Sequence, residues 1–281
     1  ENEMLRSGRF PHTNAVKVPE ELRPVFDVAE GTVREYFRDF KMDPGCGTIE
    51  INEQRYVLVR ASAFSKGFLE TIQGLYADKG PSEAFAIGRN FLFDYAHVIG
   101  MHDARDFHQK MQLTDPIARL SAGPVHFAWS GWAFVNIHPE SNPSPDDDFL
   151  LLYDHPYSFE ADSWVRAGAL SQEPVCVMNS GYSSGWCEES FGLPLTAVEV
   201  SCIAKGDAKC SFVMAPPHRI QEHLEKINSQ KKYASRKQYN IPTLFERKKV
   251  EEEMERSKAL AEESAKAKDD FVANMSHELR T

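Results

Sequence analysis

The sequence predicts an α+β fold followed by one long helix, and three observations support this prediction. Apolar residues recur at helical spacing between residues 61 and 122, whereas residues 122–216 contain short aromatic and β-branched runs separated by loop residues. After Pro217 the composition changes abruptly, because residues 218–281 contain one proline, no glycine and many charges. The first two regions together indicate a small antiparallel sheet with packed helices.

Composition limits the function classes. Hydrophobic residues make up 42% of the 281 residues, which is enough for a sizeable core, and the formal net charge is −10. That charge argues against nonspecific nucleic-acid binding, which needs a basic face. No apolar run approaches the roughly 20 residues of a membrane span, and the first residues do not resemble a signal peptide. We therefore expect a cytoplasmic protein that contacts neither nucleic acid nor membrane.

The first half predicts one hairpin and three helices. Residues 1–45 are a polar N-terminal segment and a candidate for dimer formation. Ile49 and Ile51, then Tyr56 and Leu58, alternate with other residues, which predicts a hairpin that turns at residues 52–54. Helices are expected from Ala61 to Tyr76, over residues 81–100 with an end near Gly100, and over residues 103–122 with a break before Pro116.

The second half is expected to be rich in strands. The runs at residues 125–138 and 147–159 have the aromatic and β-branched composition of strands. Residues 163–192 indicate a helix, a break and a second helix, and residues 195–216 predict a hairpin that turns at Lys205, Gly206 and Asp207. The globular part is expected to end at Pro216 and Pro217.

Four residues in this half form a candidate metal site: Cys176, Glu199, Cys202 and Cys210. Five cysteines in a chain of this kind do not indicate a disulfide framework, so metal binding or burial as small apolar side chains is preferred. Thiolates and a carboxylate suit Zn²⁺, and four protein ligands leave no open position, so such a zinc would be structural. The alternative is that the cysteines only pack in the core.

A family resemblance bears on this choice. The segments "EPVCVMNSGYSSGWCEESFG" and "AVEVSCIAKGDAKCSF", with "GTIEINEQRYVLVRAS" and "GPVHFAWSGWAFVNI" before them, resemble the 4-vinyl reductase domain. This domain also forms the sensory part of bacterial activators that respond to xylenes and phenols. The resemblance implies a ligand-sensing domain over residues 46–217. In the aromatic-sensing members a Cys, a Glu and two further Cys hold zinc, and those positions fall on the four residues named above.

The resemblance also implies a small apolar pocket beside the zinc for a small aromatic or apolar effector. The relatives use a His and a Trp to bind a phenolic hydroxyl, and His155 stands here where phenol sensors carry the Trp. That departure indicates a different or more polar effector. The alternative is that these aromatic residues only fill the core. The candidate ligand-binding residues are His126, Trp129, Trp132, His155, Tyr157 and Tyr182.

Residues 218–270 are expected to form a linker and a signalling coiled coil. A heptad register places Val250, Met254, Ala261 and Phe271 on one seam, together with small and polar residues. A seam this weak fits either a solvated single helix or a parallel homodimeric coiled coil that is marginal enough to switch. We favour the coiled coil.

Residues 271–281, "FVANMSHELRT", resemble the H-box that opens the phosphoacceptor domain of sensor histidine kinases. The resemblance makes His277 the phosphoacceptor, Glu278 the acid or base beside it, and Thr281 the residue that positions water for dephosphorylation of a response regulator. Imidazole suits this role because its ordinary pKa leaves it largely neutral near pH 7. No nucleotide-binding motif occurs in residues 1–281. Whether the chain is an enzyme is therefore open, and alone it should be inactive as a kinase.

These observations predict the sensory part of a two-component histidine kinase, in which an effector controls His277 through the coiled coil. Two alternatives stay open. One is a tetrapyrrole-binding or tetrapyrrole-processing protein of the 4-vinyl reductase family. The other is a metal or redox switch in which the cysteines themselves are the sensor.

Overall fold

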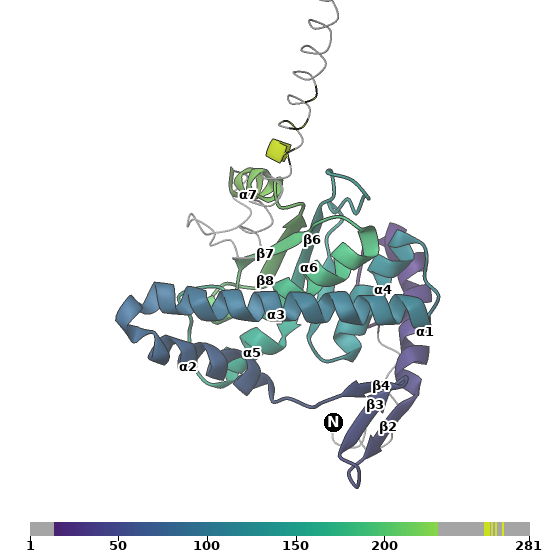
Figure 1. Cartoon of the computed structure of the whole chain (residues 1–281), viewed down its shortest axis with the longest axis horizontal. Coiled ribbons are helices and arrows are strands. Elements are labelled where there is room, and N and C mark those ends of the chain that lie inside the picture. The colour runs from purple at the N-terminus through teal and green to yellow at the C-terminus, as the bar shows by residue number, and fades with distance from the viewer. Residues whose placement is uncertain (1–13, 230–255, 259, 261, 263–265, 267–281) are drawn as a thin grey trace, which may run out of the picture.

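A five-stranded sheet and a long helix pair organise the computed structural model, which describes residues 14–229 and residues 256–258, 260, 262 and 266. The strand order in this sheet is β1-β5-β6-β8-β7, and a separate sheet has the order β2-β3-β4. Figure 1 shows the smaller sheet projecting from one end of the molecule, while α3 runs across the middle. No helix among the described residues is both long and apolar enough to cross a membrane.

The elements alternate between helices and short strands along the chain. Their bounds are β1 Val16–Lys17, α1 Arg23–Arg38, β2 Phe40–Asp43, β3 Thr48–Ile51, β4 Gln54–Tyr56, α2 Phe68–Leu75, α3 Pro81–Lys110, α4 Pro116–Trp129, β5 Ala133–Ile137, β6 Leu151–Ser158, α5 Phe159–Arg166, α6 Val177–Phe191, β7 Thr196–Ser201, β8 Cys210–Ala215 and α7 Ile220–Ser229. A π-helical turn, Ala63–Gly67, leads into α2. The mixed α+β class with packed helices is confirmed. The sheet is antiparallel except where β1 pairs in parallel with β5.

The predicted hairpin near residue 52 is confirmed, but it belongs to a larger unit. Asn52 and Glu53 both have positive φ, of 48° and 65°, as the tight turn of a two-residue hairpin requires. A third strand, β2, pairs antiparallel with β3. Helix α1 precedes it, and the sequence analysis did not predict either element. The polar stretches around α1 obscured a helix that buries Phe26, Val33 and Tyr36 on one face.

The predicted helix end at Gly100 is wrong, because α3 continues without interruption to Lys110. Gly100 lies where α3 crosses α6, and a β-carbon there would stand 2.1 Å from the carbonyl oxygen of Tyr182. On α6, Gly181 and Gly185 meet the α3 backbone in the same way, 2.3 Å from the Phe93 oxygen and 2.1 Å from the His97 oxygen. The three glycines therefore allow close approach of two helix backbones, and none of them ends a helix.

The expected strand at residues 125–138 is only half correct. Residues up to Trp129 belong to α4, and the strand β5 begins at Ala133. Asp115 starts α4 by accepting a hydrogen bond from the backbone N–H of Ala118 at 2.8 Å, and Pro116 occupies the first helical position. Aromatic composition alone cannot distinguish a short buried helix from a strand.

The hairpin at residues 195–216 is confirmed as β7 and β8, with Gly206 in the left-handed region at φ 92°. Beyond it, α7 packs on the face of the large sheet that points away from α3, where Ile220 and Leu224 contact Val198 and Val213. This helix lies in the range that the sequence analysis assigned to a linker. The predicted coiled coil and the H-box lie outside the described residues, apart from the few positions between 256 and 266.

Candidate functional site

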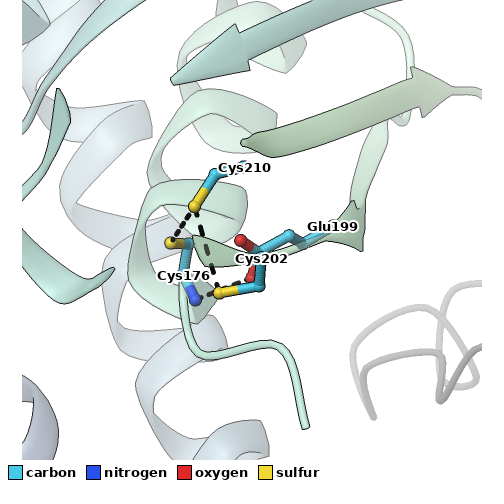
Figure 2. A group of neighbouring side chains, drawn as sticks. All are labelled: Cys176, Glu199, Cys202 and Cys210. Carbon is cyan, nitrogen blue, oxygen red and sulfur yellow. Dashed lines mark hydrogen bonds between the residues drawn. The ribbon is translucent and has the colours of Figure 1, made fainter. Parts of the chain in front are cut away.

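The four residues of the candidate metal site converge in the structure. Figure 2 shows the thiols of Cys176, Cys202 and Cys210 and the carboxylate of Glu199 pointing toward one another. One ligand atom from each lies within 4.8 Å of every other, and all four residues are buried. Cys176 caps the start of α6, Glu199 lies on β7, Cys202 follows β7, and Cys210 begins β8. Four elements therefore meet at one point, which we call the cysteine cluster.

The distances within the cysteine cluster suit a tetrahedral metal. The Cys176 and Cys210 sulfurs are 3.6 Å apart, and those of Cys210 and Cys202 are 3.9 Å apart. Sulfurs placed tetrahedrally about 2.3 Å from Zn²⁺ would be about 3.8 Å apart. All three cysteines are free. The spacing is thus that of ligands around an ion.

Electrostatics give a second test of fit. Burial raises the pKa of the Cys176 thiol and the Glu199 carboxyl well above their ordinary values, and the Cys202 charge adds to this at Glu199. Oε2 of Glu199 accepts from the Cys176 backbone N–H at 2.8 Å, whereas its buried Oε1 has no partner in the described part of the chain. A divalent cation would occupy that unpaired oxygen and remove the need for protons. The residues therefore fit zinc.

An apolar cavity of about 30 Å³ lies on the same side of the sheet as the cysteine cluster. The volume counts the space open to the centre of a water-sized sphere, and a single water needs about 10–15 Å³ of it. The cavity lies between β5, β6, α4 and α6. Its walls are Leu120, Gly123, Pro124, Phe127, Val135, Ile137, Leu151, Tyr153, His155, Tyr182, Ser183, Trp186 and Cys187.

The polar groups of the cavity are few and uncharged near neutral pH. Burial lowers the pKa of His155 to about 3 despite the nearby Asp154 carboxylate, so the imidazole is neutral. Its Nε2 is buried without a partner among the described residues. The Tyr153 hydroxyl lies 2.8 Å from Ser183 Oγ, which donates to the Asn179 carbonyl. His155 is thus the wall residue with an unused hydrogen-bonding atom.

Two of the six predicted ligand-binding residues, His155 and Tyr182, line the cavity. His126 lies behind it, among the rings of Tyr36, Phe107 and Trp186. Its Nδ1 is 3.2 Å from the Tyr182 hydroxyl, which donates to Asp103 at 2.9 Å. His126 therefore acts on the cavity through Tyr182.

The other three predicted ligand-binding residues lie farther away. Trp132 packs on Tyr182 with ring centroids 4.6 Å apart, and Trp129 packs on Phe37 of α1. Tyr157 is 75% exposed, because the strand pleat turns it away from the core.

The sequence analysis missed several cavity residues, and periodicity could have found some of them. Leu151 and Tyr153 precede His155 by four and two residues on β6, so all three share one face of the strand. Ser183, Trp186 and Cys187 lie at positions i, i+3 and i+4 of α6 and share one face of that helix. Burial raises the pKa of the Cys187 thiol to about 12, which makes this side chain a poor nucleophile.

The predicted phosphotransfer residues His277, Glu278 and Thr281 lie outside the described residues. Their assignment stays a prediction from the sequence.

Comparisons with known proteins agree with this geometry. Residues 157–216 match the 4-vinyl reductase domain, and residues 37–141 match the family described as activator of aromatic catabolism. The phenol regulator MopR of Acinetobacter guillouiae is 26% identical over 171 residues, which cover 60% of this chain and 29% of MopR. The transcriptional regulatory protein XylR of Pseudomonas putida is 25% identical over 167 residues, which cover 59% of this chain and 28% of XylR. The chain thus spans less than a third of each relative.

A solved structure supports the fold. The phenol-responsive sensory domain of the transcription activator PoxR, crystallised with phenol, superimposes with a TM-score of 0.59 at 18% identity, covering 75% of this chain and 97% of that domain. At this identity the likeness concerns the fold alone. The chain therefore carries a 4-vinyl reductase domain at residues 157–216, preceded at residues 37–141 by the sensor region of activators of aromatic catabolism.

Proposed function

We propose that residues 14–229 form an effector-binding sensor domain that takes a small, neutral aromatic molecule in the cavity beside the cysteine cluster. The observation that carries this proposal is the unpaired, buried Nε2 of His155 in an otherwise apolar cavity. A few convergent polar atoms in apolar walls are typical of small-molecule sites. The similarity to a phenol regulator and to a phenol-responsive sensory domain supports an aromatic effector.

The cavity also restricts the effector class. The wall carries no charged side chain at neutral pH, so aromatic carboxylates would be buried without a counter-charge at high cost. About 30 Å³ holds roughly two waters, which is less than a single aromatic ring needs, so side chains of the wall have to move on binding. A tetrapyrrole macrocycle is far larger still, and the tetrapyrrole alternative is therefore not favoured.

Effector binding is tested by thermal unfolding of the whole chain. Phenol at a hundred times its dissociation constant should stabilise the protein by about 2.7 kcal/mol, which is about 5–10 °C for a domain of this size. Benzoate and protoporphyrin should give no shift. His155→Phe should lose most of the phenol shift, and Tyr157→Phe, two residues along β6 but exposed, should keep it. If neither phenol nor any other monocyclic aromatic shifts the transition, the effector proposal fails.

A structural zinc in the cysteine cluster belongs to the same proposal. Cys176, Glu199, Cys202 and Cys210 would hold it with no position left for water or substrate. When bound, the ion supplies positive charge that keeps three thiolates and a carboxylate together and fixes α6 to the β7–β8 hairpin. The redox-switch alternative would require thiols that lose the ion to mild oxidants, and a tightly held zinc that resists oxidant would argue against it.

For the output we propose a symmetric dimer whose C-terminal helices control His277. Strand β6 connects the two ends of this route, because Tyr153 and His155 line the cavity while Leu152 packs in the cluster with α7. An effector can shift such an equilibrium only by its different affinity for the two packings. The motif at residues 271–281 favours a phosphoacceptor and a response-regulator partner, whereas the activator relatives favour direct control of transcription.

The two outputs differ in one measurable product. If His277 is a phosphoacceptor, the natural protein incubated with labelled ATP should acquire acid-labile, base-stable phosphate, and effector should change the amount. His277→Gln should abolish the label, and His223→Gln, a histidine of α7, should leave it unchanged. Undiminished labelling of the His277 variant, or none in the natural protein, would favour the transcriptional output.

A further inference from the structure

We infer that Asn179 couples the effector cavity to the cysteine cluster, so that effector and zinc strengthen each other's binding. This inference rests on the proposed function, because it needs both a metal and an effector. It goes further by assigning a regulatory relation between the two sites and a positioning residue that carries it. Asn179 itself is not among the cavity walls or the four cluster residues.

Asn179 stands between the two sites in the first turn of α6, three residues after Cys176, and is fully buried. Its side-chain Nδ2 donates to Ser158 Oγ at 2.8 Å and lies 3.5 Å from Nδ1 of His155. Ser158 Oγ in turn lies 3.2 Å from Cys176 Sγ. One amide group therefore contacts the polar residue of the cavity and, through one hydroxyl, a ligand of the cysteine cluster.

The hydrogen bonds along this connection all run in compatible directions. A metal-bound thiolate can only accept, so Ser158 donates to Cys176 and accepts from Asn179. The other N–H of Asn179 points to Nδ1 of His155, which places the imidazole proton on Nε2, the unpaired atom of the cavity. An effector oxygen that accepts from Nε2 would polarise the imidazole, and chains of such bonds strengthen one another. The effector would thereby favour the arrangement in which Ser158 stabilises the Cys176 thiolate.

The sheet supplies a second contact between the sites. His155 on β6 pairs directly with the cluster residue Cys210 on β8, and the His155 ring lies 4.3 Å from the ring of Phe212. Phe212 also pairs with Glu199 on β7. A movement of His155 that makes room for a ring is therefore transmitted to two metal ligands through adjacent backbone pairs. Asn179 adds the hydrogen-bonded connection that makes the coupling specific to a polar effector.

The test measures the zinc dissociation constant of the whole chain against a competing chromophoric chelator, with and without saturating phenol. Couplings between protein sites are typically roughly 5- to 150-fold, so phenol should tighten zinc binding at least about fivefold. In Asn179→Leu, which keeps the volume and removes the amide, zinc and phenol should still bind but phenol should no longer change the zinc constant. Ser190→Ala is the matched control, because this buried hydroxyl of α6 donates only to the Trp186 carbonyl. It should retain the full coupling.

The outcomes separate the inference from the proposal beneath it. If the wild-type chain binds neither zinc nor phenol, the proposed function fails, and this inference fails with it. If both bind and phenol leaves the zinc constant unchanged, or if Asn179→Leu keeps the coupling, only the inference is overturned. Should Asn179→Leu not fold, Ser158→Ala breaks the same connection on the metal side, and its coupling decides.

Discussion

Cys202→Ala is expected to purify without zinc and to unfold far more easily than the wild-type protein. Cys202 is fully buried and supplies one of four converging ligand atoms. Without it, the remaining thiols and the Glu199 carboxyl stay enclosed with no cation to balance them. Zinc at a thousand times its dissociation constant stabilises a fold by about 4.1 kcal/mol. The free energy of unfolding should therefore fall by about 4 kcal/mol, measured by urea denaturation alongside metal analysis.

Cys187→Ala is the matched control for this prediction. Cys187 is also a buried free thiol, and it lies outside the cysteine cluster. The same chemical change should leave the zinc content at one ion per chain and cost about 1 kcal/mol, the usual effect of a point substitution. Equal zinc content in the Cys202 and Cys187 variants would refute the metal assignment. Equal loss of stability with no zinc in either variant would reduce the four residues to core packing.

Gly185→Ala should be the most damaging single-methyl substitution in the helix pair. The added β-carbon would stand 2.1 Å from the His97 carbonyl oxygen and 2.9 Å from the Met101 nitrogen, both on the backbone of α3. Backbone atoms cannot move aside as a flexible side chain can, so α3 and α6 would have to separate. Overpacking of a tight core costs about 1–3 kcal/mol and sometimes more, and we expect the upper end of that range. Because Trp186 and Cys187 follow on the cavity wall, phenol binding should weaken as well.

Gly74→Ala makes the same substitution in a helix without the neighbour. Gly74 lies near the end of α2, where nothing stands within 4 Å of an added β-carbon. Alanine there should raise the free energy of unfolding by about 0.5–1 kcal/mol through lower backbone entropy of the unfolded chain. Urea denaturation of both variants tests the pair. If Gly185→Ala is as stable as the wild type, the close helix crossing is not what its glycine serves.

Local signals predicted local elements well. Both hairpins form where the turn residues indicated, since a turn of this kind depends on a few adjacent residues. The helix–break–helix pattern of residues 163–192 is also confirmed by α5 and α6. Errors arose where a neighbour far along the sequence decides the structure. Gly100 signals a helix end in isolation, and only the carbonyl of Tyr182 explains a glycine in the middle of α3.

The two candidate sites differ in how far the sequence could lead. Residue type and family resemblance together named all four members of the cysteine cluster, because metal ligands belong to a short list of residue types. The cavity was predicted from the same resemblance, yet two of six candidates line it. Aromatic residues serve core and pocket alike, so their type does not decide which role each one has.

The sequence by itself determined the α+β class, the hairpin turns, the identity of the four cysteine-cluster residues and the H-box motif at residues 271–281. Each depends on residue chemistry or on neighbours within a few positions. Only the tertiary structure decided that Tyr157 faces solvent, that His126 stands behind Tyr182, and that Asn179 joins the cavity to the cysteine cluster. Those facts depend on the packing of α6 against β6 and α3, and such packing brings together atoms that the chain order keeps apart.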